Sequence, residues 1–210
     1  MQVIILFGVL VCTYLMIMAK RISALICSFR YQSFFLFLAT FTVAWHEQQT
    51  ELFIVAILLF AIKVCAIPYF LYRIINRIKV NEDLGLFINA QLSLIWALVF
   101  TYLSWVFARH LPASGGGKEI MLAVAFFVVV SGVFLMIFRM TALAQITGLL
   151  VMENGLFLLA STVSGGMPFF VEIAIFFDVF VSVIIMGFFV YRINKLFTHI
   201  DVNKLSRLKG

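Results

Sequence analysis

Long apolar segments separated by short polar ones dominate the hydrophobic pattern of this chain. Seven can be placed, at about 2–19, 31–46, 52–72, 84–108, 119–138, 141–162 and 168–191. Each approaches the roughly 20 residues that an α-helix needs to cross a bilayer. Stretches such as "VAFFVVVSGVFLMIF" are not expected to form strands, because lipid offers no partner to an open sheet edge. The pattern predicts an all-α, polytopic membrane protein with about seven transmembrane helices.

The composition supports this prediction. The chain is 65% hydrophobic and 11% charged, with a mean hydropathy of +1.17. Soluble domains are about half apolar and a quarter charged, so one core in a chain of 210 residues cannot hide this surplus. Cys12, Cys27 and Cys65 are far apart and form no Cys pair or Cys/His cluster. We therefore expect buried free thiols, with no disulfide framework and no metal or iron–sulfur site.

Positive charge falls on alternate connections between the predicted helices. Twelve of the fifteen Lys and Arg residues share one side: Lys20, Arg21, Arg30, Arg73, Arg77, Lys79, Arg139, Arg192, Lys195, Lys204, Arg207 and Lys209. The other side has only Arg109 and Lys118. The positive-inside rule then predicts an external N-terminus and a cytoplasmic C-terminus. No basic residue precedes the first apolar run, so that run is expected to be a retained span and not a secretory signal.

A glycine-rich break suggests how the helices are grouped. Residues 111–118, "LPASGGGK", follow the fourth predicted helix and are expected to form a flexible external loop. They lack the strand-to-helix setting of a phosphate-binding loop. The loop would separate a four-helix membrane part, 1–110, from a three-helix part, 119–210, that ends in a cytoplasmic tail.

Four ionisable residues fall inside predicted spans: Lys63, Glu153, Glu172 and Asp178. Each costs a few kcal/mol near the bilayer centre, so such residues usually mark ion or substrate paths. Lys63, Glu153 and Asp178 lie near the middle of their predicted spans, whereas Glu172 is nearer the outer end. Burial disfavours the charged forms of these groups and a nearby opposite charge favours them. This balance suits a proton relay, although a static buried ion pair remains the structural alternative.

Several neighbouring residues could support such a relay. Gln145 is eight residues before Glu153 and is expected on the same helix face, two turns away, while Asn154 directly follows Glu153. Ser182 lies one turn after Asp178, on its face. Pro68 lacks the N–H that would bond the carbonyl of Val64, so a distortion is expected beside Lys63. For each of these residues taken singly, ordinary hydrogen bonding between helices is the favoured interpretation.

No motif for a nucleotide, haem or flavin and no Ser/His/Asp arrangement is present. The three histidines, His46, His110 and His199, lie at span ends or in loops and are scattered singly. We therefore expect this chain to hold no cofactor or metal, to bind no nucleic acid and to catalyse no reaction alone.

The residues resemble a known family. The segments "LLVMENGLFLLA", "VEIAIFFDVFVSVIIM" and "HIDVNKLSRLKG", together with "IKVCAIP" around Lys63, resemble the hydrogenase-4 component E family. Its members are membrane subunits of energy-converting hydrogenase and formate hydrogenlyase complexes. The resemblance implies antiporter-like membrane subunits, other small membrane subunits and a peripheral hydrogenase-like redox module as partners. Metal and iron–sulfur centres would lie in those partners, and the complex in the prokaryotic inner membrane.

Residues 119–210 are also similar to the K subunit of complex I and the C subunit of Mrp antiporters. Matched to that family, Glu153 and Asp178 take the places of its two membrane glutamates, which implies a role on the proton-coupling axis. Asp178 is one methylene shorter than the family's glutamate. We therefore expect a non-redox subunit of a proton-pumping oxidoreductase, in which Glu153, Asp178, Lys63 and Glu172 form a proton path. A stand-alone secondary transporter and a purely structural scaffold are the alternatives.

Overall fold

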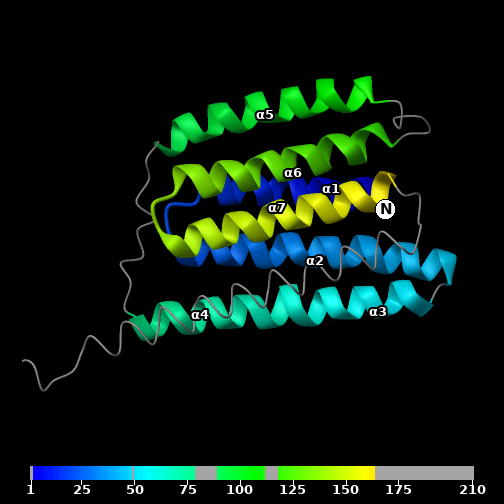
Figure 1. Ribbon diagram of the computed structural model, residues 1–210, viewed down its shortest axis with the longest axis horizontal. Coiled ribbons are helices and arrows are strands. Elements are labelled where there is room, and N and C mark those ends of the chain that lie inside the picture. Colours follow the sequence, from blue (N-terminus) through cyan, green and yellow to red (C-terminus); the bar gives the residue numbers. More distant parts are fainter. Residues whose placement is uncertain (1, 49, 79–88, 112–117, 164–210) are drawn as a thin grey trace, which may run out of the picture. The chain divides into compact units, whose positions relative to one another are not determined.

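The computed structural model describes residues 2–48, 50–78, 89–111 and 118–163, which all belong to the compact unit Met1–Ala174. These residues are helical and contain no extended strand. The helices in chain order (Figure 1) are α1 Gln2–Met18, α2 Ile22–Glu47, α3 Thr50–Leu59, the π-helix η1 Phe60–Ala66, α4 Ile67–Ile78, α5 Ala90–His110, α6 Glu119–Phe138 and α7 Ala142–Val163.

The all-α, multi-pass membrane fold is confirmed. Among the described residues, five helices are long and apolar enough to cross a membrane, and α1 is a shorter apolar helix. Helices α3, η1 and α4 follow one another without a break and provide a single span, Leu52–Ile75. The seventh predicted segment, 168–191, lies outside the described residues. The placement of the N-terminus outside and the C-terminus inside stays a prediction.

One predicted boundary is wrong. The second span was expected to begin at residue 31, but α2 begins at Ile22, so Arg30 lies within a helix and not in a loop. Leu25, Ile26 and Phe29 are fully buried and hold this first part of α2 against the bundle. Arg30 is exposed, and because a long arginine side chain can extend along a helix toward the interface, its charge does not end the helix.

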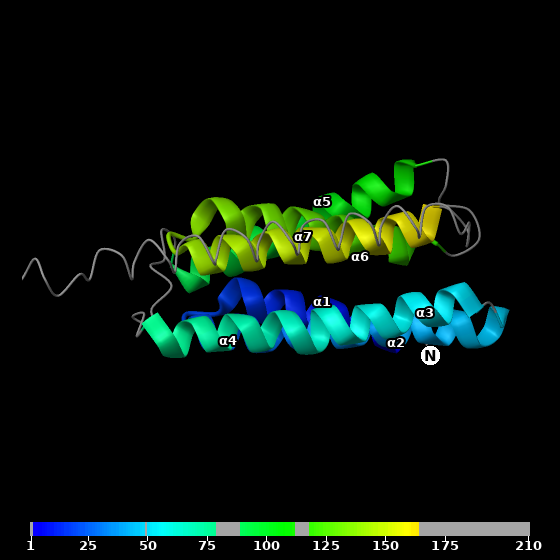
Figure 2. The same cartoon turned by 60° about the horizontal axis from the view of Figure 1, so that its bottom comes forward.

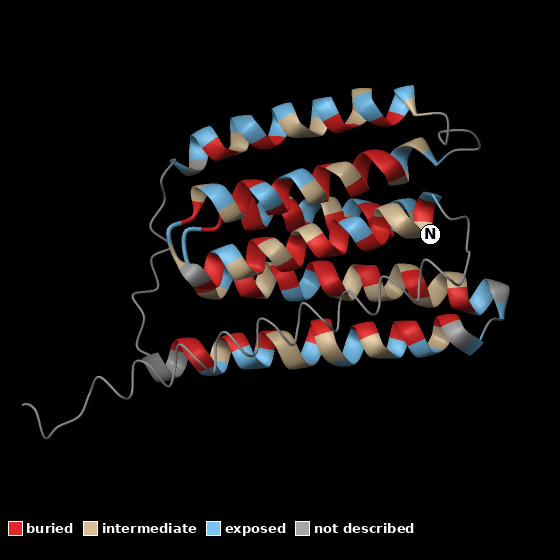
Figure 3. Ribbon diagram, viewed as in Figure 1, coloured by how far each residue is buried: buried red, intermediate tan, exposed pale blue. Residues whose placement is uncertain are grey.

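The helices lie in two layers within this unit. Figure 2 shows α1, α2, α3 and α4 in one layer and α5, α6 and α7 in the other. Contacts of α1 with α5 and α6, and of α2 with α7, join the layers. Figure 3 shows α6 and α7 largely buried, whereas α5 is exposed along much of its length. A side chain on α7 can therefore meet residues of the α1–α4 layer.

Close packing of α6 and α7 depends on glycine. A Cβ atom on Gly132 would lie 2.7 Å from the carbonyl oxygen of Gly148, and one on Gly155 would lie 2.6 Å from the backbone nitrogen of Val129. Small residues at such positions let membrane helices approach closely and gain van der Waals contact. This close approach fixes the position of α7 against α6.

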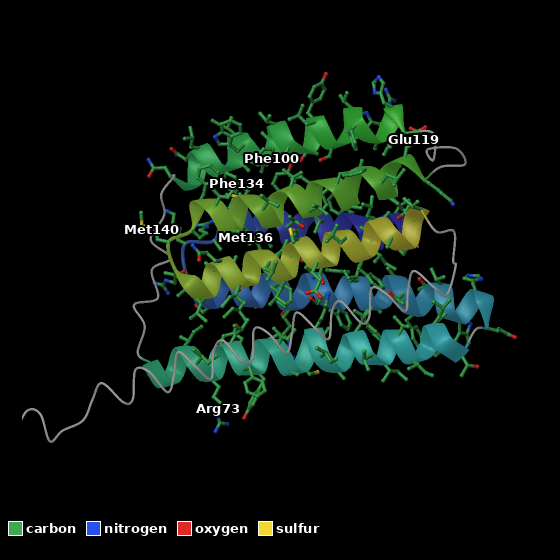
Figure 4. The ribbon with its side chains drawn as sticks, in the orientation of Figure 1. Arg73, Phe100, Glu119, Phe134, Met136 and Met140 are labelled. Carbon is green, nitrogen blue, oxygen red and sulfur yellow. The ribbon has the colours of Figure 1, made fainter. Side chains whose placement is uncertain are left out.

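Aromatic side chains fill the space between α5 and α6. Phe100 and Phe134 lie next to one another (Figure 4), with ring centroids 5.6 Å apart in an edge-on arrangement. Phe134 also packs against Phe138 on the same helix, with ring centroids 4.6 Å apart. The rings of Tyr14 on α1 and Phe127 on α6 have centroids 5.1 Å apart. These aromatic contacts pack α1 and α5 against α6.

Two bonds bring basic residues to one end of the bundle. Arg139, between α6 and α7, is buried and donates from Nη2 to the carbonyl of Ile17 near the end of α1, at 2.6 Å. Tyr72 donates to the carbonyl of Ser23 at the start of α2, so Arg73 lies at that end too. Burial lowers the pKa of Arg139 to about 10, which leaves it charged at neutral pH. Arg73 and Arg139, which the charge pattern of the sequence assigned to the same side, thus lie at the same end of the bundle.

The three cysteines are free. Cys12 is buried, Cys27 is half-buried and Cys65 is exposed. The expectation of buried thiols therefore holds for Cys12 and is wrong for Cys65, which is exposed although Lys63 and Val64 just before it are buried.

Replacing Gly132 by alanine should destabilise the protein by about 1–3 kcal/mol, because the new methyl group meets backbone atoms of α7 that cannot turn aside. Gly8→Ala is the matched control, since a Cβ there meets only the ring of Phe35. Thermal unfolding in detergent measures both variants. Equal losses would contradict a special role for the α6–α7 contact.

Candidate functional site

Lys63 lies on a distorted segment at the midpoint of its span. It belongs to η1, where the N–H of Ile67 bonds the carbonyl of Ile62, five residues earlier. Pro68 follows this segment directly and has no N–H to continue the ordinary pattern. The expected distortion beside Lys63 therefore takes the form of a π-helix. Such segments inside α-helices are frequent at functional sites.

The Lys63 side chain points into the bundle and is 1% exposed. Its Nζ donates to Oδ1 of Asn154 at 2.9 Å and lies 3.8 Å from Oε2 of Glu153. Both partners are 2% exposed and lie in the middle of α7. An ion pair between two residues far apart in the sequence is thus completely enclosed by protein at mid-span.

Asn154 extends this contact to two more helices. Its Nδ2 donates to Oε1 of Gln32 at 3.1 Å and to Oγ of Ser33 at 3.2 Å, both on α2. Gln32 in turn donates from Nε2 to Oγ1 of Thr13 on α1, at 2.8 Å. We call the connected residues the polar network: Thr13, Gln32, Ser33, Lys63, Glu153 and Asn154. All six are buried.

The polar network explains how charge is tolerated here. Taking an ammonium and a carboxylate out of water costs several kcal/mol each, and their attraction offsets this only with good geometry and further hydrogen bonds. Asn154 provides such a bond to Lys63 and is itself held by Gln32 and Ser33. The charged pair is therefore supported by neutral groups from α2 and α7.

The structure brings some predicted site residues together and not others. Lys63, Glu153 and Asn154 meet, as described. Gln145 does not join them: it is exposed and donates to the carbonyl of Arg139 at 3.2 Å. Eight residues turn a helix by about 80° beyond two full turns, so Gln145 and Glu153 do not share one face. The other three predicted residues, Glu172, Asp178 and Ser182, lie outside the described residues.

Thr13, Gln32 and Ser33 were missed in the sequence. The predicted start of the second span at residue 31 placed Gln32 and Ser33 at the membrane surface, where polar side chains need no explanation. The true start at Ile22 puts them well inside the helix. The signal that could have revealed this is the mostly apolar run from Ile22 to Phe29, which only two serines interrupt.

The polar network contains two groups, Lys63 and Glu153, between which one proton can be shared. A Lys–Glu pair can keep one proton on either partner, as ammonium with carboxylate or as amine with carboxylic acid, and the local charges decide which. Glutamine, asparagine, serine and threonine add donors and acceptors that keep their place without changing charge. Among the residues the structure describes, no three His, Cys, Asp or Glu side chains gather closely enough to hold a metal ion.

Removing Lys63 should expose the cost of the buried carboxylate. Lys63→Met leaves Glu153 without its cation and should destabilise the protein by about 3 kcal/mol or more. The double variant Lys63→Met with Glu153→Met buries no charge and should recover most of this loss. Thermal unfolding of both variants tests this. A double variant no more stable than Lys63→Met would contradict a direct charge interaction.

Known proteins resemble this chain over most of its length. It is 29% identical to hydrogenase-4 component E of Escherichia coli K12 over 206 residues, which cover 97% of this chain and 95% of that protein. Hydrogenase-4 component E of Shigella flexneri matches equally. An uncharacterised protein of Mycobacterium tuberculosis is 26% identical over 165 residues, 78% of this chain and 75% of that one. These matches confirm the resemblance inferred from the sequence segments.

No family model matches the chain. No solved structure matches it either.

Proposed function

We propose that this chain, a relative of the hydrogenase-4 component E proteins over nearly its whole length, is a membrane subunit of a hydrogenase complex that carries part of a proton path. The observation that carries the proposal is the enclosed pair of Lys63 and Glu153 at mid-span, joined by Asn154. An enclosed pair of opposite charges at this depth is costly, and its groups can exchange a proton.

In this proposal, Glu153 receives and releases the proton that moves. Lys63 compensates the charge of Glu153 when the carboxylate is ionised, and Asn154 keeps Lys63 in place when it is not. Asp178 would take the proton onward, with Ser182 beside it, and Glu172 would lie toward the outer exit. The similarity of residues 119–210 to the K subunit of complex I supports placing Glu153 and Asp178 on one path.

The partners would be antiporter-like subunits, other small membrane subunits and a peripheral redox module that holds the metal and iron–sulfur centres. The names of the E. coli and S. flexneri relatives support membership in a multisubunit hydrogenase. The complex would lie in the prokaryotic inner membrane. Helix α5 contacts α6 and α1 and leaves Ile95, Tyr102 and Phe107 exposed, a face that either lipid or a neighbouring subunit can cover.

A structural scaffold is the second candidate, because the same pair could only fix η1 against α7. The two candidates differ in what a neutral isostere does. A scaffold needs only the hydrogen-bonding shape of Glu153, which glutamine provides, whereas a relay needs a group that gains and loses a proton.

Glu153→Gln tests the relay. In inverted membrane vesicles that contain the complete complex, protons translocated per electron should fall roughly tenfold or more, because glutamine cannot accept a proton. Glu119→Gln is the matched control: Glu119 lies in the first turn of α6, away from the polar network, and its removal should leave the ratio unchanged.

If the Glu153→Gln complex assembles fully and translocates as many protons per electron as the parent, the relay is contradicted and the scaffold is favoured. Asp178→Asn extends the test to the next predicted carboxylate and should lower the ratio in the same way.

The composition of the native complex tests the partners. Gentle solubilisation of the membranes, affinity capture of this chain and mass spectrometry should recover antiporter-like subunits together with subunits that bear iron–sulfur centres. A chain that is recovered alone and transports ions in liposomes would instead support a stand-alone transporter.

A further inference from the structure

One line of hydrogen bonds connects the backbone of α1 to Lys63. It begins at the carbonyl of Val9, which accepts from Thr13 at 2.7 Å. Thr13 accepts from Gln32 at 2.8 Å, and Gln32 accepts from Asn154 at 3.1 Å. Asn154 accepts from Lys63 at 2.9 Å. This line crosses from α1 through α2 and α7 to η1.

The direction of this line is fixed at its α1 end. A backbone carbonyl can only accept, so the single hydroxyl proton of Thr13 is committed to Val9. Thr13 must then accept from Gln32, which turns the amide nitrogen of Gln32 toward α1. The oxygen of that amide therefore faces Asn154 and can only accept.

The same constraint then fixes Asn154. Its nitrogen must face Gln32, and its oxygen is left for Lys63. The hydroxyl of Ser33 accepts from the same Asn154 nitrogen at 3.2 Å, so this orientation also satisfies a further buried group. Reversing the Asn154 amide would place two donors, its nitrogen and the Lys63 Nζ, against each other. All these groups are buried, where an unmet donor is costly.

We propose that Thr13 and Gln32 are positioning residues for Lys63, acting through Asn154. The Asn154 oxygen holds Nζ at 2.9 Å while Glu153 Oε2 lies at 3.8 Å, beyond a direct hydrogen bond. Lys63 thus keeps a fixed acceptor whatever the protonation state of Glu153, and the charge pair does not collapse into a tight contact. This inference rests on the proposed proton path, in which that state changes.

Thr13→Val tests the line at its origin. Valine has nearly the same shape but cannot accept from Gln32, so the buried Nε2 of Gln32 loses its acceptor. Gln32, and through it Asn154, is then held less firmly in place. In vesicles with the complete complex, protons translocated per electron should fall about fivefold, the equivalent of one lost hydrogen bond, and the pH profile of translocation should shift. Thr13→Ser keeps the hydroxyl and should restore both values.

Thr40→Val is the matched control. Thr40 is a buried threonine of α2 whose hydroxyl bonds the carbonyl of Leu36, four residues earlier, as Thr13 bonds Val9. It is not in the polar network, so its loss should change neither the ratio nor the pH profile. Gln32→Met interrupts the line at a second point and should act like Thr13→Val.

Three results would overturn the positioning role. The first is that Thr13→Val and Gln32→Met translocate protons with the parental ratio and pH profile. The second is that Thr40→Val loses as much coupling as they do. The third is that Thr13→Val and Gln32→Met fail to assemble while Thr40→Val assembles. The Glu153→Gln variant separates this from failure of the proton path. Unchanged coupling in Glu153→Gln rejects the path itself, whereas lost coupling there with no effect of Thr13→Val rejects only the positioning role.

Discussion

An ammonium group in the middle of a membrane helix must be given acceptors by the helices around it, and the described structure is arranged around that requirement. Lys63 reaches from η1 past α2 to Asn154 and Glu153 of α7. The helix that carries Lys63 contacts α2 and not α7 over most of its length. The ion pair is therefore a direct link between α7 and the layer formed by α1–α4, made by one long side chain.

Meeting that requirement constrains the backbone on both sides. On one side, Pro68 and the π-helix before it set the direction in which Lys63 leaves its helix. On the other, Gly132 and Gly155 let α7 pack closely on α6, which fixes where Glu153 and Asn154 lie. The nearest atoms around a Cβ at either glycine belong to the facing helix and not to Lys63 or Glu153. Their contribution to the site is positional, since a small shift of α7 would change the distances from Glu153 and Asn154 to Lys63, Gln32 and Ser33.

The sequence was sufficient to predict features that follow from the chemistry of a residue itself, without knowledge of which helices surround it. Lys63 and Glu153 were identifiable because a charge in an apolar run is expensive wherever its partner is, and counting from the helix ends gave their depth. Pro68 was identifiable because the missing N–H is a property of proline itself. The all-α fold followed in the same way, from segment length and the cost of an unpaired backbone in lipid.

The sequence was insufficient where position depended on other helices. Gln32 is an ordinary polar residue near a predicted boundary. It became significant only because α2, with Leu25 and Ile26 fully buried, starts at Ile22 and not at residue 31. Thr13 could equally have bonded only its own helix, as Thr40 does. Gln145 looked aligned with Glu153 by spacing alone, yet the rotation of the helix directs it to the carbonyl of Arg139.

The polar network also gives the N-terminal helices a reason to be present. Glu153 and Asn154 come from α7, while Lys63, Gln32 and Thr13 come from η1, α2 and α1. These earlier helices thus provide the cation beside Glu153 and the groups that orient Asn154. If Glu153 carries protons, the N-terminal helices influence when this carboxylate gains and loses its proton, because they provide the charge and the hydrogen bonds beside it.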